Sequence, residues 1–541
     1  MAHRSELLAR LDSQPFDLLI IGGGIVGAGT ARDAAMRGLR VALIEQGDFA
    51  SGTSSKTSKL IHGGLRYLEH GHLGLVVESL RERHILRTIA PQMVWPLELM
   101  VPVYRGDSRS AWKIALGLAL YDWLALRWNI RTHRMLSRRL VLRAESRLDH
   151  QGLRAAGVYS DCQMDDARLC LANILQAIRF GAVCCNYVKL IAFEKTAGTL
   201  SGALVEDRRT GQRFAVRAQV VVNATGPWAD AVRRLSDPRA PQRLAPTKGA
   251  HLVVPRLSDR AFFLQARHDN RMIFLVPWGN YSLIGTTESR VHEDLNGLHA
   301  SPEDAEYLLA EANRAFPEAG LTPEAVVAAF AGARPLLAFS GSSTGASREH
   351  RIDIDRFGLV SIMGGKYTTY RVMAQQTLET VVRRLRRPAE RCLTDQVALL
   401  EPTHPVVLDR WQEVTSRIAP ELLARLLTAY GTGAFRVLQL LEFEPALAQP
   451  VCPHHDLIQA ELVYCWQEEL ACTVSDLLVR RTPIAFSSCQ GLDMLSTLAD
   501  LLGRYGRLSG EQLAEQLDDY RAFLAASLSF RAQPATTLAV R

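Results

Sequence analysis

A glycine-rich turn between a short apolar strand and a helix constrains this chain more than any other feature. Residues 17–21 read as a buried strand, and Gly22, Gly24 and Gly27 follow it at the start of a helical pattern. Gly22 permits a tight turn, Gly24 lets backbone approach a pyrophosphate, and Gly27 allows the helix to pack closely on the strand. The next predicted strand ends in Glu45, where a carboxylate can accept hydrogen bonds from ribose hydroxyls. This order of elements predicts a dinucleotide-binding site.

Two later segments repeat the strand–turn–helix pattern. Residues 220–226 read as a buried strand that runs into a turn of small residues, and 359–365 as a strand whose glycine pair opens a helix. Either segment alone is equally typical of an ordinary connection, but helix starts that present free N–H groups suit a phosphate-bearing cofactor. Three such junctions favour FAD over NAD. They resemble the two-domain FAD-binding fold of the glutathione-reductase and amino-acid-oxidase type, a Rossmann-like domain with a β-rich substrate domain. The expected cofactor contacts in these later segments are Ala224, Thr225, Gly226, Gly365, Lys366 and Thr368.

The chain changes character near residue 400. Residues 1–400 alternate β-branched runs with helical patterns, which predicts α/β layering with the FAD-binding and substrate domains interleaved in sequence. Residues 401–530 are helical in pattern almost throughout and predict a separate C-terminal domain. Residues 531–541 are expected to form a flexible tail.

The charge of the chain is concentrated in two segments. The 541 residues are 48% hydrophobic and 22% charged, which indicates an ordinary globular protein and argues against a disordered or fibrous one. The formal net charge is +7, and the arginines of residues 127–154 and 381–391 exceed that whole surplus. Such patches suit nucleic acid, a membrane surface or an anionic substrate. No basic platform with interleaved aromatic residues is present, so we expect no nucleic-acid partner.

Neither a membrane span nor a metal site is expected. The longest uncharged runs are about a dozen residues, short of the ~18–20 that a span requires, and three glycines interrupt the only N-terminal apolar run. The nine cysteines form no CxxC pair and fit reduced thiols in the cytosol. Cys452, His454, His455 and Cys465 match no standard zinc spacing, so we assign them ordinary structural roles and predict no metal.

A long collinear set of motifs resembles the FAD-dependent, respiratory glycerol-3-phosphate dehydrogenases. The most specific is residues 53–69, TSSKTSKLIHGGLRYLE. The C-terminal region resembles the helical cap of that family more loosely, through residues 477–482. The remaining motifs are residues 159–162, 165–169, 223–228, 248–251, 284–287, 332–335 and 364–371.

The resemblance implies oxidation of sn-glycerol 3-phosphate to dihydroxyacetone phosphate, with a hydride passed to flavin N5 and electrons passed on to a membrane quinone. A phosphate dianion needs fixed cations, and a developing alkoxide needs a nearby base or cation. Arg66, Arg334 and Lys366 are cations in glycine-rich, otherwise neutral stretches. The resemblance assigns them to the substrate phosphate and oxyanion, and it makes Arg334 catalytic.

Other site residues follow from the same motifs. The resemblance casts Tyr67 and Thr287 as neutral donors to the substrate, and Arg348 is a weaker candidate for the phosphate pocket. His251 is the favoured general base because imidazole titrates near working pH. His62 is its rival, better cast as a flavin-loop residue. The hydroxyl-rich loop is expected to contact the diphosphate, ribityl chain or flavin ring through Thr53, Ser54, Ser55 and Ser58.

Two segments combine apolar residues with arginines. Residues 110–126 are mostly apolar and lead into the first arginine cluster, and the helix from Lys366 carries an apolar stripe followed by the second. Both patterns are typical of a helix on anionic lipid, and equally of a core helix with a solvated basic end. The resemblance favours attachment to the cytoplasmic face of the inner membrane. An oxygen-using glycerol-3-phosphate oxidase and a non-catalytic or RNA-modifying flavoprotein remain the alternatives. A homodimer and the role of the C-terminal domain are left open.

Overall fold

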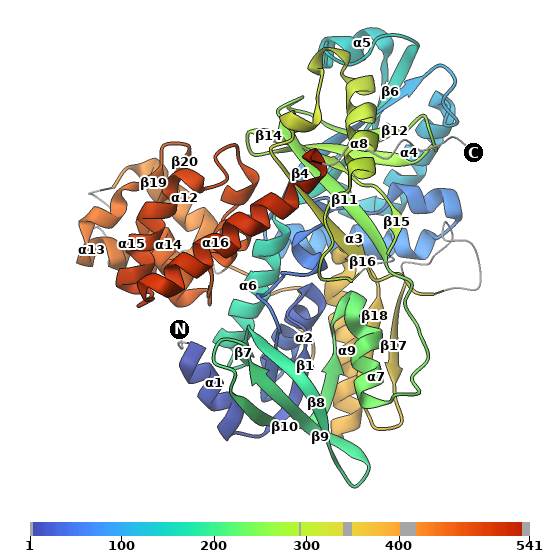
Figure 1. Ribbon diagram of the computed structural model, residues 1–541. Coiled ribbons are helices and arrows are strands. Elements are labelled where there is room, and N and C mark those ends of the chain that lie inside the picture. The colour runs from blue at the N-terminus through green and yellow to red at the C-terminus, as the bar shows by residue number, and fades with distance from the viewer. Residues whose placement is uncertain (1–3, 292–293, 339–348, 401–417, 533–541) are drawn as a thin grey trace.

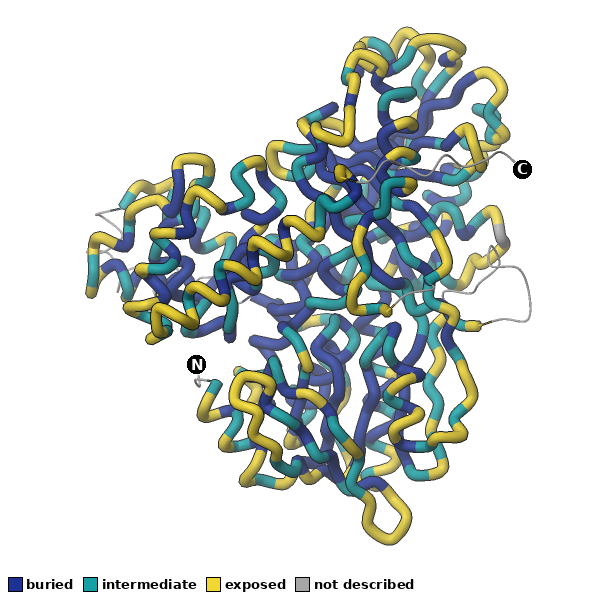
Figure 2. Tube along the Cα trace, viewed as in Figure 1, coloured by how far each residue is buried: buried dark blue, intermediate teal, exposed yellow. Residues whose placement is uncertain are grey.

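The computed structural model describes residues 4–291, 294–338, 349–400 and 418–532. Figure 1 shows three parts: a lower α/β layer system, an upper part built around a second sheet, and a helical domain to one side. The buried residues run continuously through the lower and upper parts, as the dark core of the tube in Figure 2 shows. The helical domain has a core of its own.

The first sheet is a Rossmann-like layer. β1 (Phe16–Ile21) is buried at all six positions and pairs in parallel with β2 (Val41–Ile44) and β10 (Arg213–Asn223). A strand covered on both faces needs apolar side chains at every position, which explains its unbroken apolar run. The order along the sheet is β17 (His350–Ile354), β18 (Val360–Gly364), β10, β1, β2 and β7 (Val183–Cys185).

Helices and a hairpin complete this first part. α2 (Ile25–Met36) packs against both α6 (Asp166–Arg179) and α9 (Tyr370–Leu385). β8 (Val188–Thr196) and β9 (Thr199–Asp207) extend from β10 as an antiparallel hairpin. The remaining helices of this part are α1 (Arg4–Ser13) and α7 (Ala229–Ser236).

The second sheet is mostly antiparallel and carries the other face of the site. Its strands run in the order β15 (Ser289–Arg290), β11 (Thr247–Pro255), β14 (Tyr281–Gly285), β13 (Met272–Trp278), β12 (Ala261–Gln265), β4 (Val94–Tyr104), β6 (Leu153–Met164) and β3 (Leu60–Ile61). β16 (Ala328–Arg334) pairs with β11, and β5 (Arg134–Ser137) pairs with β6. The associated helices are α3 (Leu73–Ile89), α4 (Ala111–Ala125), α5 (Arg138–Ala144) and α8 (Pro302–Ala315).

The C-terminal part is helical, in agreement with the sequence pattern. A small hairpin, β19 (Pro450–Cys452) with β20 (His455–Ile458), is its only sheet among the described residues. Its helices are α12 (Pro420–Tyr430), α13 (Ala434–Phe443), α14 (Gln459–Glu468), α15 (Leu495–Tyr505) and α16 (Gly510–Ser527).

A buried ion-pair cluster fastens this helical part to the Rossmann-like layer. Arg481 donates two hydrogen bonds to the Asp48 carboxylate, at 2.7 and 2.9 Å, and Arg480 donates a third at 2.6 Å. Arg481 and Asp48 are both buried, and the two guanidinium charges hold the pKa of Asp48 well below its usual range against the opposing effect of burial. Residues more than 400 positions apart are thereby joined through charges that are paired away from water.

The structure corrects one sequence-based expectation about lipid contact. The apolar stripe of α9 faces inward, because Tyr370, Ala374, Leu378 and Val381 are all buried. α9 therefore packs in the core with a solvated basic end, and it presents no apolar face to a membrane. Periodicity alone could not separate these cases, because core-facing and lipid-facing helices share the same stripe.

Candidate active site

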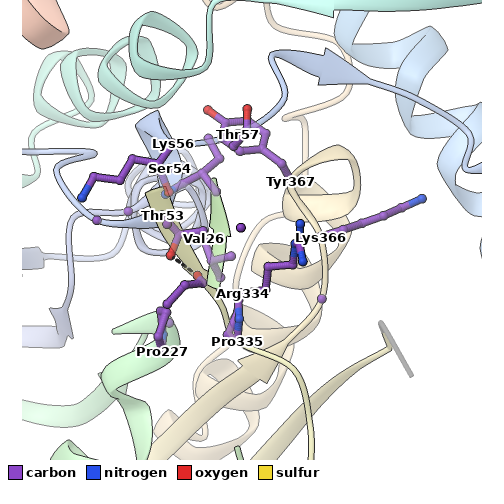
Figure 3. A pocket seen from close by; sticks show the side chains of 18 of the residues that line it. Val26, Thr53, Ser54, Lys56, Thr57, Pro227, Arg334, Pro335, Lys366 and Tyr367 are labelled. Carbon is purple, nitrogen blue, oxygen red and sulfur yellow. Dashed lines mark hydrogen bonds between the residues drawn. The ribbon is translucent and has the colours of Figure 1, made fainter. Parts of the chain in front are cut away.

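One large cavity lies between the two sheets, with a volume of about 780 Å³. Strand ends and turns of the first sheet line one side of it, and β11, β13 and β16 of the second sheet line the other. Figure 3 shows Thr53 and Ser54 to the upper left of Arg334, Pro335 and Lys366 around the cavity. Open α/β sheets bind ligands outside the carboxyl ends of their strands, which is where this cavity lies.

The glycines of the first turn are required by close backbone contacts. Gly22 has a φ of +109°, and a Cβ there would lie 2.7 Å from the carbonyl oxygen of Ala224. A Cβ on Gly27 would lie 2.0 Å from the oxygen of Gly22. Gly27 does not line the cavity, and it acts through the helix–strand packing that the sequence predicted. Backbone at Gly22 and Gly24 is thus left open to a ligand.

Glu45 and Ser54 organise the start of α2. The Glu45 carboxylate accepts hydrogen bonds from the N–H groups of Gly23, at 2.7 Å, and Gly47, at 2.8 Å. Burial raises the pKa of Glu45, and these two bonds oppose that shift by stabilising the carboxylate. Ser54 Oγ accepts the N–H of Ile25 at 2.9 Å. Both side chains line the cavity, Glu45 as the predicted partner of the ribose hydroxyls and Ser54 as a predicted contact of the diphosphate, ribityl chain or flavin ring.

The rest of the hydroxyl-rich loop connects the two sheets. Thr53 donates to the carbonyl of Ala333 at 2.6 Å, and Ser58 hydrogen-bonds to His251 at 2.9 Å. Ser55 is an exception to the prediction, because it does not line the cavity. Its carbonyl instead accepts a hydrogen bond from Lys59, whose ammonium also pairs with Asp166 at 2.5 Å. Ser55 therefore supports the loop rather than facing a cofactor.

The two later junctions reach the same cavity. Ala224, Thr225 and Gly226 line it after β10, and Gly365 and Thr368 line it after β18. Thr368 hydrogen-bonds to the backbone of His62, which also lines the cavity. The parallel pairing of β10 with β1 and with β18 brings these turns together. Three turns that are distant in sequence thus share one site, as the sequence predicted.

Three predicted cations line the cavity: Arg66, Arg334 and Lys366. Arg334 Nη2 donates to Thr286 Oγ1 at 2.8 Å and to the Thr287 carbonyl at 3.1 Å. The ammonium of Lys366 lies 4.9 Å from the ring centroid of Tyr67, a cation–π contact. Positive groups from three separate segments therefore converge where an anionic ligand can be held.

Two further predicted substrate contacts, Thr287 and Arg348, are not found as substrate contacts in the described chain. The Thr287 hydroxyl accepts the N–H of Ala250 at 3.0 Å and donates to the buried carboxylate of Asp304. With its hydrogen used in this way, Thr287 serves the scaffold and is not the neutral donor expected from the sequence. Arg348 lies outside the described residues.

His251 is buried on β11 at the cavity wall. Its Nε2 hydrogen-bonds to Ser58, its ring stacks on Phe330 at 5.0 Å, and within the described chain its Nδ1 has no hydrogen-bond partner. Burial, together with the charges of Arg334 and Lys59, lowers the pKa of His251 well below its usual value. The imidazole is therefore neutral at neutral pH, and its Nδ1 is buried, while Nε2 contacts the cavity-lining Ser58.

Sequence reasoning missed three cavity residues. Arg271 lines the cavity with its charge near Asp269 and Glu288, but it stands in a polar turn without a motif. Thr286, which orients Arg334, was within a recognised motif and could have been found there. Lys56 also lines the cavity, and burial together with Arg480 lowers its pKa to about 8. Its amine points away from Arg334 and Lys366 in Figure 3.

Comparison with known proteins identifies relatives along the whole chain. Residues 17–371 match the family model "FAD dependent oxidoreductase", and residues 361–513 match "C-terminal domain of alpha-glycerophosphate oxidase". A glycerol-3-phosphate dehydrogenase of Synechocystis sp. is 36% identical over 95% of this chain and 97% of its own length. The human mitochondrial glycerol-3-phosphate dehydrogenase is 34% identical over 98% of this chain and 76% of its own.

A solved structure shows the same architecture. The crystal structure of the Bacillus halodurans glycerol-3-phosphate dehydrogenase in complex with FAD superposes with a TM-score of 0.80, at 28% identity and covering 99% of both chains. The FAD-binding α/β fold with a helical C-terminal domain is thus confirmed.

Proposed function

Because the chain belongs to the FAD-dependent glycerol-3-phosphate dehydrogenases, we propose that its cavity holds FAD and glycerol 3-phosphate end to end, and that the electrons pass to a membrane quinone. The enzyme oxidises glycerol 3-phosphate. The observation that carries the rest of the proposal is that Arg66, Arg334 and Lys366 line the same cavity as the glycine turn and His251, with the charge of Arg334 close enough to His251 to lower its pKa.

The residues of the cavity fit FAD. The backbone at Gly22 leaves no room for a side chain, the α2 N-terminus faces the cavity, and Glu45 stands at the end of β2. A helix start stabilises a diphosphate, and a carboxylate at this position accepts ribose hydroxyls. FAD bound there supplies the two-electron acceptor, with its N5 receiving the hydride from the substrate carbon. The turns at Thr225 and Gly365 are the proposed contacts for the rest of the cofactor.

The cationic end of the cavity selects a phosphate ester. Arg334 is held by Thr286 and the Thr287 carbonyl, so its planar fork is oriented before a ligand arrives. Lys366 over the Tyr67 ring adds a compact point charge. Together with Arg66 these groups can bind a dianion bidentately and stabilise the alkoxide that develops during oxidation. Unphosphorylated glycerol would leave these charges unmatched.

His251 is the proposed base. A neutral imidazole can take the hydroxyl proton of the substrate at Nε2, which hydrogen-bonds to the cavity-lining Ser58, while Phe330 against the ring fixes its orientation. The positive charges of Arg334 and Lys59 make the protonated ring unfavourable. We therefore infer that His251 passes the proton on during the turnover and does not store it.

Replacing His251 with alanine is expected to lower kcat about 100-fold, within the range that general-base catalysis contributes, while FAD occupancy stays near that of the wild type. The wild type should keep most of its kcat between about pH 7.5 and 6.5, because the lowered pKa of His251 leaves the imidazole neutral over this interval. Steady-state rates and the flavin-to-protein absorbance ratio measure both effects. Unchanged turnover in the alanine variant would remove His251 from the mechanism.

Anaerobic flavin bleaching tests the function directly. Glycerol 3-phosphate should reduce the bound flavin of the purified enzyme, and equimolar unphosphorylated glycerol should leave it oxidised. Equal bleaching by both would contradict the phosphate pocket. In air and with a quinone present, hydrogen peroxide should form in much less than stoichiometric amount relative to the substrate oxidised. Stoichiometric peroxide would indicate an oxidase.

An exposed apolar stripe on α4 supports the membrane part of the proposal. Trp112, Leu116 and Trp123 are 63–66% exposed and follow one face of α4 at spacings of four and seven residues, and Leu126, just after the helix end, is 68% exposed. All eight arginines of residues 127–154 are exposed next to this stripe in sequence. No helix of the described chain is long and apolar enough to cross a bilayer. Apolar anchors with a basic fringe suit the surface of an anionic membrane, and we place the enzyme on the cytoplasmic face.

A Trp112→Ser/Trp123→Ser double variant is expected to float with anionic vesicles at least about tenfold less than the wild type, since two exposed anchors are removed from one face. High salt should also release the wild type, because arginine–lipid attraction is screened. Solution activity with a soluble electron acceptor is the matched control and should not change. Equal flotation of wild type and variant at low salt would show that α4 is not the contact.

A further inference from the structure

The small hairpin of the C-terminal domain places a cysteine and a histidine opposite each other. Cys452 at the end of β19 is the cross-strand partner of His455 at the start of β20, with only Pro453 and His454 between them. The hairpin joins neither of the larger sheets. A two-stranded ribbon on its own is marginally stable in water and needs a further contact to hold its turn.

A loop that is distant in sequence brings a second cysteine to this turn. Within the described residues, the ligand atoms of Cys452, His455 and Cys489 all lie within 4.8 Å of one another. His455 Nε2 is 3.4 Å from Cys489 Sγ, and Ser487 Oγ lies 3.1 Å from that nitrogen and 3.3 Å from that sulfur. Cys465, which the sequence suggested as the partner of this segment, is instead buried in the domain core.

These distances match the edges of a tetrahedral metal site. With Zn–S of about 2.3 Å and Zn–N of about 2.0–2.1 Å, tetrahedral angles put a sulfur and a nitrogen ligand about 3.5 Å apart. The sulfur atoms also accept backbone hydrogen bonds, Cys489 from the N–H of Gly491 at 3.5 Å and Cys452 from the N–H of His454. Such bonds favour the thiolate, the form of cysteine that binds a metal, although burial raises the pKa of the Cys452 thiol in the metal-free chain.

We propose that Cys452, His455 and Cys489 form a binding site for a zinc-class divalent metal ion, with Ser487 Oγ or water at the fourth position. Two thiolates and a neutral imidazole balance the two charges of the ion, so the site is neutral when it is filled. Zinc is the favoured occupant because sulfur and imidazole ligands in tetrahedral arrangement suit it, and it brings no redox chemistry of its own.

The bound ion would hold the loop that joins the C-terminal domain to the substrate sheet. Next to Cys489, Ser488 receives a hydrogen bond from Tyr281 of β14 and donates its N–H to the same hydroxyl at 2.7 Å. Gln490 donates to the Val327 carbonyl at 2.9 Å. Phe486 packs edge-on against Phe330, the residue that stacks on His251. The ion therefore fastens an inter-domain contact two side chains away from the proposed base.

Metal binding can be measured on the full-length flavoprotein, purified with reductant and stripped of metal by a chelator. We expect one equivalent of Co²⁺ to give the red d–d absorption of tetrahedral thiolate-bound cobalt, at longer wavelength than the flavin bands, and Zn²⁺ to displace it. One equivalent of Zn²⁺ should raise the unfolding temperature, since a ligand that binds only the folded state stabilises it. Cys452→Ser and Cys489→Ser should each weaken Co²⁺ binding at least about tenfold.

Cys472→Ser is the matched control, because Cys472 is a free cysteine of the same domain outside the cluster. It should bind Co²⁺ as the wild type does. A stripped wild type that shows no tetrahedral cobalt spectrum would overturn the proposal. So would a Cys489→Ser variant with wild-type affinity, or a Cys452–Cys489 disulfide in the protein as purified under reductant, which would make the pair a covalent link instead.

Discussion

Replacing Gly22 with alanine is expected to give a folded protein that has lost its flavin. The residue has a φ of +109°, and the new Cβ would lie 2.7 Å from the carbonyl oxygen of Ala224, so either the turn or β10 must move. Backbone strain and the clash together amount to about 3 kcal/mol, or roughly 100-fold weaker FAD binding. The flavin-to-protein absorbance ratio after gel filtration and the FAD dissociation constant measure this effect.

Gly38 provides the matched control for Gly22. It has a φ of +75°, follows α2 in the same domain, and has no atom within 4 Å of the position that a Cβ would take. Gly38→Ala therefore introduces a side chain at positive φ without a clash, at about 1 kcal/mol of stability, and should keep its flavin. If Gly22→Ala also retained FAD at wild-type affinity, the glycine turn would not be the diphosphate site.

Replacing Arg334 with alanine is expected to lower kcat/KM for glycerol 3-phosphate about 100- to 1,000-fold. This range corresponds to the loss of a buried, charge-assisted contact of about 3–4 kcal/mol. Arg334 is held in place by Thr286 and the Thr287 carbonyl, so its guanidinium is oriented before the substrate binds. Because Arg334 also lowers the pKa of His251, the rates should be compared above about pH 7.5, where the imidazole is neutral in both proteins.

Two comparisons separate phosphate binding from a general loss of structure in the Arg334 variant. FAD occupancy should stay at the wild-type level, because Arg334 is a proposed substrate contact and not one of the proposed contacts of FAD. The slow rate with unphosphorylated glycerol, measured at high concentration, should fall far less than the rate with glycerol 3-phosphate. If the rates of the variant with the two substrates fell by the same factor, Arg334 would not be the group that recognises the phosphate.

Local patterns were enough to predict that most of the proposed cofactor contacts line the cavity. Gly22, Glu45 and Thr225 stand at strand ends, and the carboxyl ends of parallel strands must share an edge of the sheet. The hydroxyl-rich motif that begins at residue 53 predicted that Thr53 and Ser54 line the cavity. Their detailed contacts, such as Ser54 capping the first N–H of α2, needed the folded chain, because the partner lies 29 positions away.

The wrong expectations arose where the same sequence pattern occurs in two different structural environments. The stripe of α9 is equally apolar whether it faces a bilayer or a core, and contact with α2 decided for the core. Ser55 alternates with Ser54 in a motif rich in hydroxyls, yet only Ser54 faces the cavity. Thr287 sits in a motif next to Thr286, and the register of β11 decides which hydroxyl reaches Arg334.

The sequence by itself determined the α/β class, the dinucleotide turn and the identity of the cations, because strand alternation, glycine conformation and residue chemistry act over a few neighbouring positions. Only the tertiary structure decided which distant groups meet: Arg480 and Arg481 with Asp48, Ser58 with His251, and Cys489 with the Cys452–His455 turn. Those contacts depend on how sheets and helices pack in three dimensions, and no local pattern specifies that packing.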